Sequence, residues 1–209
     1  MKKSYLDGNG NTVILGAIKG LVSDGNEVRD ALRDFRPETV AATISPEEAE
    51  GLLKFLDSPF EVSISDYETI YGVNLSRFGE VMVPPPMFIE AARYCKENGV
   101  PLVGLDMDDE HYNEAYRRSV GTMALVRHSL RKNRVARKVF TSSSAEEFVD
   151  EWKREMWKVK GFRVLDMLRQ DEVVRNIRRL MGEGRRLAVV CELEMYSDVL
   201  SSIAGKSSE

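Results

Sequence analysis

The sequence predicts an α/β fold, with a central mostly parallel sheet flanked by helices and a charged helical excursion over about residues 107–165. Two observations lead to this prediction. Short apolar runs, several of them rich in β-branched residues, are typical of strands that are buried on both faces. Between these runs lie segments whose apolar residues recur every three or four positions, as in amphipathic helices. Strands that alternate with helices in this way favour a parallel sheet with right-handed crossovers.

The first part of the chain contains two strand–helix pairs. Residues 12–17 and 39–44 are apolar runs that we expect to form central strands. The helix between them ends before Pro37, because a residue that precedes proline avoids helical geometry. A second helix begins after Ser45, which can cap it, with a proline in the first helical position and Glu48 completing a capping box.

The middle of the chain is less regular. Val62 and Ile64 alternate with polar residues, as in a half-exposed edge strand. Three prolines at residues 84–86 form a stiff, extended connector. A helix over about residues 88–98 ends before a glycine, and residues 101–105 are expected to form a third buried strand.

The second half of the chain is mainly helical. Residues 111–160 are strongly charged and include a capping box that starts at Ser144. Trp152 lies on the apolar stripe of the helix that follows, which predicts a place in the core or in an interface. Beyond it we expect a helix, a last buried strand, a short helix and a frayed tail, at about residues 173–180, 187–194, 199–203 and 205–209.

The composition is that of a globular protein with one domain, which we expect to span residues 1–204. Of the 209 residues 43% are hydrophobic and 31% are charged, and the net charge of −4 offers no general attraction for nucleic acid. No apolar stretch approaches the roughly 20 residues that cross a bilayer, and the first residues turn polar before a signal-like core develops. We therefore expect a cytoplasmic protein that does not bind membranes. Cys95 and Cys191 lie in apolar segments and are expected to be reduced and buried.

Polar residues follow the predicted strands, at the edge of the sheet where α/β proteins place their sites. The candidate ligand-binding residues are Gly16, Lys19, Thr43, Ser45, Asp106, Asp108 and Glu194. The candidates for catalysis are Lys19, Asp106, Glu192 and Glu194. One interpretation is a polar cleft in which Lys19 pairs with Glu194 or binds an anion. The other, which we favour, is an ion pair that only stabilises the fold, since charged pairs are common in structural roles. These candidate residues imply no cofactor.

An acidic segment follows the third predicted strand, and it contains Asp106, Asp108, Asp109, Glu110 and His111. Its oxygen atoms could bind Mg²⁺ or Ca²⁺, but the segment lacks the glycine and the distal glutamate of an EF-hand. An acidic loop that caps the next helix is the favoured interpretation, because negative charge stabilises a helix N-terminus. We therefore predict no metal site, and name Asp106, Asp108 and Glu194 as the residues that would form one.

A basic run lies in the charged helical region, and it consists of Arg127, His128, Arg131, Lys132, Arg134, Arg137 and Lys138. Such a run could bind nucleic acid, but no aromatic side chain is interleaved with it for base stacking, and the chain is acidic overall. A solvated helix face is favoured. We expect it to pair with an acidic stretch, either within the chain or across a dimer; this stretch is Glu146, Glu147, Asp150 and Glu151.

Five segments carry a further pattern, and they are residues 16–19, 36–43, 88–108, 168–172 and 187–194. Their order and spacing resemble the TraB/pheromone-shutdown family, whose relatives include GumN-like and Tiki-type proteins. The resemblance implies a TraB-like α/β domain over most of the chain. In the enzyme-like members, two Gly-x-x-His elements and an acidic residue are linked to a divalent metal and to hydrolysis.

The polar residues of that family pattern are replaced in this chain. Lys19 and Glu194 match the two histidine positions, and Cys191 matches the glycine of the second element. Thr43 matches the glutamate of the second strand, and Met107 matches an arginine. Zinc prefers imidazole or thiolate ligands, and a protonated lysine repels a metal. The resemblance therefore implies a degenerate active site.

These observations together predict a non-catalytic, TraB-like binding or regulatory protein that forms a homodimer and binds an unidentified protein or a small anion. The alternative is a hydrolase of peptide or ester bonds, metal-assisted by the carboxylates of Asp106, Asp108, Glu192 and Glu194. A third alternative is nucleic-acid binding through residues 127–138, which would weaken steeply with salt.

Overall fold

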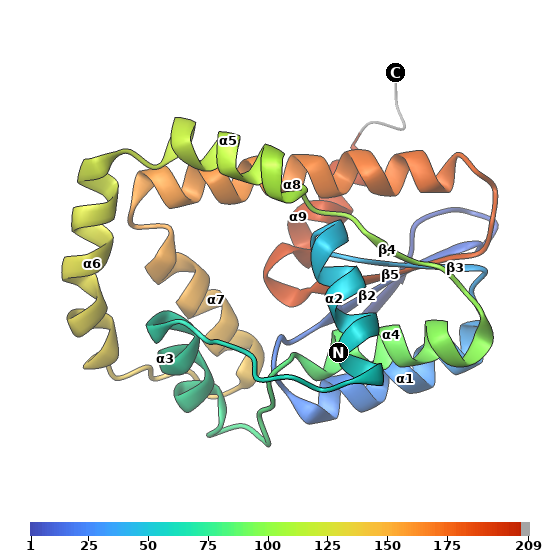
Figure 1. Cartoon of the computed structure of the whole chain (residues 1–209), viewed down its shortest axis with the longest axis horizontal. Coiled ribbons are helices and arrows are strands. Elements are labelled where there is room, and N and C mark those ends of the chain that lie inside the picture. The colour runs from blue at the N-terminus through green and yellow to red at the C-terminus, as the bar shows by residue number, and fades with distance from the viewer. Residues whose placement is uncertain (206–209) are drawn as a thin grey trace.

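The computed structural model describes residues 1–205, and the tail expected at residues 205–209 lies outside the described residues from residue 206 onward. A five-stranded sheet lies between two layers of helices, with a further group of helices beside it (Figure 1). The predicted α/β class with a mostly parallel sheet is confirmed. Among the helices of residues 1–205, none combines the length and the apolar character of a membrane span.

The strands run in the order β1-β2-β5-β3-β4, and every neighbouring pair is parallel except β1 and β2. The last strand of the chain is therefore inserted between β2 and β3. All four predicted strands form, but β4 lies at the edge of the sheet and is half-buried, which corrects the prediction of a third buried strand. The bounds are β1 Lys2–Tyr5, β2 Thr12–Ala17, β3 Thr39–Ala42, β4 Leu102–Gly104 and β5 Leu187–Glu192.

Strand β1 is the one strand among residues 1–205 that the sequence does not predict. It pairs antiparallel with β2, so that Lys2 lies opposite Gly16. Its side chains are mostly exposed, and it therefore lacks the apolar run that marks the other strands. Lysine at a sheet edge discourages pairing with another chain, and Lys2 and Lys3 occupy this edge.

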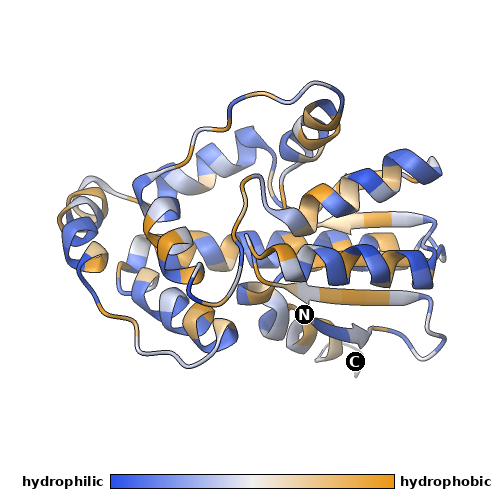
Figure 2. Ribbon diagram, turned by 90° about the horizontal axis from the view of Figure 1, so that it is seen from below, coloured by the Kyte–Doolittle hydropathy of each residue, from blue (hydrophilic) through white to orange (hydrophobic). Residues whose placement is uncertain are grey.

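Two helical layers cover the sheet. Helices α1 (Val22–Phe35) and α4 (Pro86–Asn98) pack on each other and on one face, and α8 (Lys160–Met181) and α9 (Leu193–Ala204) cover the other. Because side chains alternate along a strand, Leu15 of β2 enters the first core and Ile14 the second. The apolar strands between the helical layers stand out by hydropathy (Figure 2).

Helix α2 (Pro46–Asp57) begins at the end of β3, as predicted. The main-chain N–H of Ser45 donates to Glu48 Oε2 at 2.9 Å, and the N–H of Glu48 donates to Ser45 Oγ at 3.1 Å. This capping box confirms the prediction. The helix packs on α4 and β4 and so lies beside the carboxyl ends of the strands.

The helical excursion consists of α5 (Asp109–Ser119), α6 (Thr122–Ala136), α7 (Ala145–Met156) and the first part of α8. An aromatic core that contains Phe140, Phe148 and Trp152 packs α7 against the end of α6, so the prediction of a core position for Trp152 is confirmed. Helices α5 and α8 meet in a separate cluster around Ala115 and Leu165. Helix α3 (Asp66–Leu75), which the sequence analysis does not predict, packs on this core through Tyr67 and Tyr71.

Two local predictions are wrong. The segment around Val62 and Ile64 forms no strand; both side chains are exposed, and no neighbouring strand lies beside them to supply hydrogen bonds among the described residues. The last strand ends at Glu192, two residues earlier than predicted, because α9 starts directly at Leu193. Glu194 therefore lies in the first turn of a helix rather than on the strand.

Candidate functional site

The polar residues predicted from the sequence gather where β2 and β5 end. After β2 the chain continues into α1 on one face of the sheet, and after β5 it continues into α9 on the other face. Adjacent parallel strands whose chains leave on opposite faces open a crevice at their carboxyl ends, which is where α/β proteins bind ligands. Lys19 follows β2 at this point, and Glu192 ends β5.

An ion pair joins these two strand ends. Lys19 Nζ lies 3.5 Å from Glu192 Oε1. The charge of Glu192 raises the pKa of Lys19, so this lysine stays protonated at neutral pH. The Lys19 side chain is 42% exposed and the Glu192 side chain 12% exposed. Glu192, rather than the predicted Glu194, is therefore the partner of Lys19.

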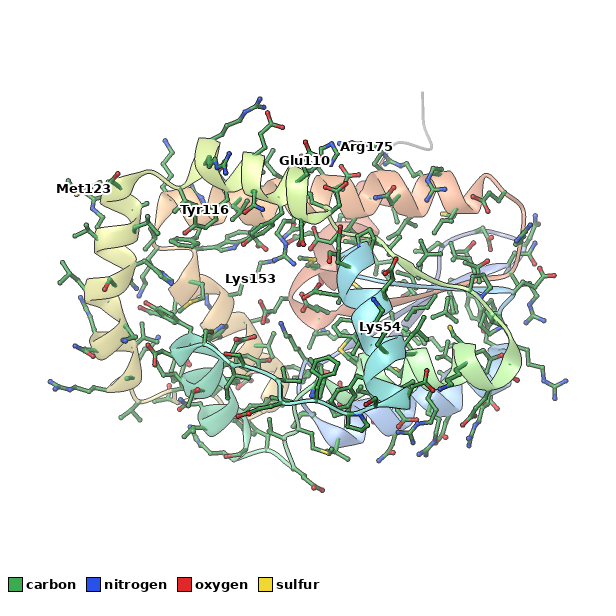
Figure 3. The ribbon with its side chains drawn as sticks, in the orientation of Figure 1. Lys54, Glu110, Tyr116, Met123, Lys153 and Arg175 are labelled. Atoms are coloured by element: carbon green, nitrogen blue, oxygen red, sulfur yellow. The ribbon has the colours of Figure 1, made fainter. Side chains whose placement is uncertain are left out.

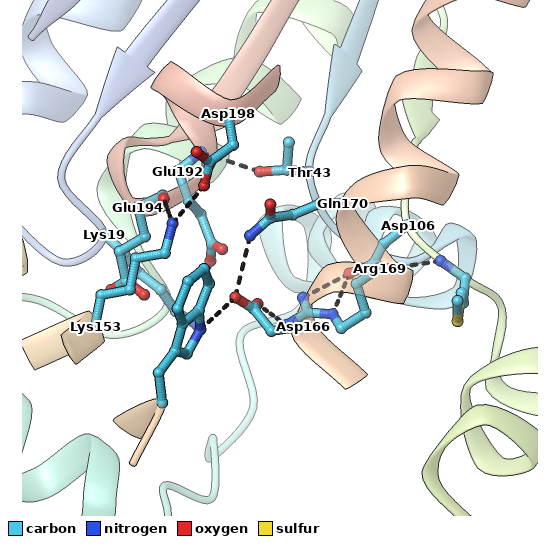
Figure 4. Close-up of polar contacts among 12 residues, drawn as sticks. Lys19, Thr43, Asp106, Lys153, Asp166, Arg169, Gln170, Glu192, Glu194 and Asp198 are labelled. Atoms are coloured by element: carbon cyan, nitrogen blue, oxygen red, sulfur yellow. Dashed lines mark hydrogen bonds and ion pairs between the residues drawn. The ribbon is translucent and has the colours of Figure 1, made fainter. Parts of the chain in front are cut away.

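Glu194 has a different role from the one predicted. Its burial and the neighbouring charge of Glu192 raise the pKa of its carboxyl group to about 8, so the group is mostly protonated at neutral pH. Its main-chain carbonyl accepts a hydrogen bond from Lys153 Nζ at 2.6 Å. Lys153 also forms an ion pair with Asp198 at 2.7 Å (Figure 4). Figure 3 shows that Lys153 reaches from α7 toward the sheet.

Thr43 and Gly16 serve the local structure of the strand ends. Thr43 is buried, and its hydroxyl oxygen accepts the main-chain N–H of Glu192 at 3.0 Å, which positions the carboxyl end of β5. A Cβ atom at Gly16 would collide with the ring of Tyr196, so glycine is required for α9 to pack on β2. The ring of Tyr196, rather than open space for a ligand, therefore lies beside Gly16.

Asp106 is fully engaged within the protein. One of its oxygens, Oδ2, accepts from Arg169 Nε at 2.7 Å, and the other accepts from the N–H of Met107 at 2.8 Å. Arg169 also lies 3.9 Å from Asp166, which accepts hydrogen bonds from Trp157 and Gln170 (Figure 4). The sequence analysis assigned no role to Arg169. Its pairing with a residue 63 positions away leaves no local signal.

Asp108 caps α5. Its carboxylate accepts the main-chain N–H of His111 at 2.8 Å and contacts the ring Nδ1 at 2.7 Å. The prediction of an acidic loop that caps the next helix is confirmed. Among residues 1–205, no group of three or more His, Cys, Asp or Glu side chains is placed to hold a metal ion.

The basic run pairs with acidic residues of the same chain. Lys138 forms ion pairs with Glu151 and Glu155, and Arg131 also pairs with Glu155. His128 stacks on the ring of Tyr67 with 4.1 Å between the ring centroids. The expected pairing within the chain is confirmed for Glu151 and extends to Glu155, which the prediction did not include.

A cavity of about 330 Å³ lies beside the Lys19–Glu192 pair. It is bounded by α2, α3, the N-terminus of α4 and two loops between them, at residues 60–64 and 81–85. Most of its lining is apolar. The large apolar side chains at its rim are the most exposed part, and they are Phe60 (54%), Val62 (37%), Ile64 (46%), Met82 (51%) and Val83 (50%).

Two glycines in the interior of helices face this cavity. A Cβ atom at Gly51 of α2 would meet no atom within 4 Å, and one at Gly72 of α3 would lie 3.8 Å from the nearest atom, Cγ1 of Val81. Glycine inside a helix costs about 1 kcal/mol relative to alanine, and here no close contact requires it. The two glycines therefore keep space open between α2 and α3.

The cavity also contains a few polar groups. Lys19, Glu48 and Glu68 line it, and the last two also cap the helices α2 and α3. The hydroxyl of Tyr71, another lining residue, is buried and has no hydrogen-bond partner. Of these residues, the sequence analysis singled out only Lys19 as a candidate. The pair of helix-interior glycines is the signal that could have revealed the cavity.

The sequence matches no protein-family model and no curated protein.

Proposed function

We propose that the protein is a non-catalytic binding or regulatory protein that holds a small, largely apolar molecule in the cavity beside Lys19. The observation that carries this proposal is the open apolar space at the carboxyl edge of the sheet, kept free by Gly51 and Gly72. Ligand pockets are concave and mostly apolar, with a few polar groups that fix orientation. The exposed rim, with Phe60 and Met82, supplies further apolar surface.

The ion pairs at the strand ends support binding rather than catalysis at that place. A general base needs a free carboxylate within reach of substrate. Asp106 is paired with Arg169, and Glu192 is paired with Lys19. The proposal includes a TraB-like origin with a degenerate site, which rests on the sequence resemblance and on the replacement of the two histidine positions by Lys19 and Glu194.

Filling the cavity tests the proposal. The variant Gly51→Leu places a side chain in space that holds no atom within 4 Å of the added Cβ. We expect the neutral fluorescent probe N-phenyl-1-naphthylamine to bind the native protein and to bind this variant at least ten-fold more weakly. Gly51→Ala is the matched control, because it adds one methyl group and leaves most of the cavity open.

Equal binding of the probe by the native protein and by the folded Gly51→Leu variant would contradict the proposal, as would the absence of any binding by the native protein. Circular dichroism of both variants, which should match the native protein, shows that a loss of binding does not come from unfolding.

We also propose that the protein forms a homodimer through α6. Met123, Val126 and Leu130 recur at helical spacing on this helix and are 66%, 47% and 73% exposed. Met123 points away from the rest of the molecule (Figure 3). The solution mass from light scattering should be that of two chains, and Leu130→Glu should shift it to one. A native mass of one chain at all concentrations would contradict this proposal.

A further inference from the structure

The charges around the cavity do not balance. Lys19 is the one cation among its lining residues in the described part of the chain, and Glu192 neutralises it. Glu48 and Glu68 also line the cavity, and neither has a salt-bridge partner within residues 1–205. A ligand in the cavity therefore meets a net negative environment.

The two carboxylates are held in place by the caps of their helices. Oε2 of Glu48 accepts the N–H of Ser45 at 2.9 Å, and Oε2 of Glu68 accepts the N–H and the hydroxyl of Ser65, both at 2.8 Å. These neutral donors fix the side chains without cancelling their charge. Both residues are exposed to solvent and belong to the lining of the cavity.

Aromatic side chains form the wall next to these carboxylates. Phe55 and Phe60 meet edge to face with 5.4 Å between their ring centroids, and Phe88 and Tyr71 also line the cavity. The face of an aromatic ring carries negative potential and attracts cations. Carboxylates beside aromatic rings form an environment that suits an ammonium group.

Tyr71, another residue of the lining, has an unsatisfied hydroxyl group. This hydroxyl is buried, and it is one of two buried side-chain polar atoms without a partner among the described residues. Burial raises the pKa of this hydroxyl well above its usual value, so it keeps its proton and stays neutral. A buried polar group without a partner is costly, so the wall of the cavity is not fully satisfied within residues 1–205.

We propose that the cavity binds a small amphiphilic cation, an amine or quaternary ammonium compound whose apolar chain lies against Phe55, Phe60 and Phe88 and whose charge lies near Glu48 and Glu68. The proposal rests on the proposed binding function and specifies the ligand class. It replaces the small anion expected from the sequence, because an anion would approach two unpaired carboxylates and a lysine that is already neutralised.

Three probes with the same eight-carbon chain separate charge from apolar binding: octyltrimethylammonium, 1-octanol and octanoate. Calorimetric titration of the native protein at low salt should show the cation binding at least ten-fold more tightly than octanoate. Glu68→Gln and Glu48→Gln should each weaken binding of the cation several-fold and leave binding of 1-octanol unchanged. Glutamine also serves in a capping box, so both variants should keep their helix caps.

Glu50→Gln is the matched control, because this residue lies on α2 outside the cavity lining and pairs with Lys54. It should change binding of no probe. If octanoate or 1-octanol binds as tightly as the cation, or if the Gln variants bind the cation normally, the charge assignment is wrong and the binding function stands. If none of the three probes binds while N-phenyl-1-naphthylamine does, the proposed ligand class is wrong. If N-phenyl-1-naphthylamine does not bind either, the proposed function itself fails.

Discussion

Two regions at the carboxyl edge of the same sheet differ in how far their polar groups are satisfied. In the network around Arg169, both oxygens of Asp106 are occupied and Asp166 accepts two hydrogen bonds. In the cavity beside Lys19, the hydroxyl of Tyr71 has no partner, and Glu48 has no counter-ion within residues 1–205. The first region is complete without a ligand, whereas the second gains contacts when one binds.

This difference shows that acidic residues at strand ends do not identify a site by themselves. The carboxylates that the sequence makes conspicuous are those with internal partners. The space for a ligand lies beside them, between helices whose most informative residues are Gly51 and Gly72. Four predictions test whether the two regions really divide structural and binding roles in this way.

The largest loss of stability is expected from breaking the network of Arg169, Asp106 and Asp166, whose polar groups have partners within the protein. Arg169→Met leaves Asp106 buried without its counter-ion, and removing one partner of a buried pair destabilises a protein by about 3 kcal/mol. Urea denaturation measures the loss. Arg175→Met is the matched control, because Arg175 is 71% exposed and pairs with Glu172 at the surface, where a pair contributes less than about 1 kcal/mol. Equal losses in the two variants would show that the network is not structural.

A second effect comes from Glu194 and depends on pH. Its pKa is about 8 in the folded protein and near its ordinary value of roughly 4.3 in the unfolded chain. Because the folded state binds the extra proton between these values, the free energy of unfolding should fall as pH rises from about 4 to 8. Glu194→Gln should flatten the profile between pH 5 and pH 9, because glutamine does not titrate. Identical pH profiles of the two proteins would contradict the assignment.

Gly104→Ala tests the close packing of β4 on the start of α2, which belongs to the structural region of the comparison. A Cβ atom at Gly104 would lie 2.5 Å from the main chain of Ser45 and Pro46, so the backbones of β4 and α2 would have to separate. Overpacking of this kind costs about 2 kcal/mol. Thermal unfolding followed by circular dichroism measures it, and an unchanged midpoint would mean that this contact is looser than the structure shows.

Gly51→Ala is the opposite case, with the smallest effect. The added methyl group meets open space, and alanine is the better helix former by about 1 kcal/mol, so this variant should be more stable than the native protein. The same thermal measurement applies. A destabilised Gly51→Ala variant would show that the space beside Gly51 is already filled.

The sequence predicts well those parts of the fold that are buried on both faces. The strands at residues 12–17 and 187–192 are wholly or almost wholly buried, and their apolar runs are continuous. Strand β1 escapes prediction because most of its side chains are exposed. Helix α3 also escapes prediction, because its apolar residues are spread around the helix instead of forming one stripe. Tyr71 faces the core, while Val73 is 66% exposed.

The site is predicted less well, for two physical reasons. The partner of Lys19 depends on where β5 ends, and a strand that ends two residues earlier than predicted moves the pairing from Glu194 to Glu192. The partner of Asp106 comes from a helix 63 residues away, and no local pattern records that contact. Residue types at strand ends therefore indicate where polar side chains gather. They do not indicate which of these side chains lack a hydrogen-bond or ion-pair partner.

The most direct test of this division is a nuclear magnetic resonance titration of the ¹⁵N-labelled protein with octyltrimethylammonium. The amide signals of Gly51 and Gly72 report on the cavity, and that of Gly104 reports on β4 next to Asp106. We expect the first two signals to shift in a saturable manner while the Gly104 signal stays in place. Saturable shifts at Gly104 with Gly51 and Gly72 unchanged would place the ligand among the acidic residues and contradict the account.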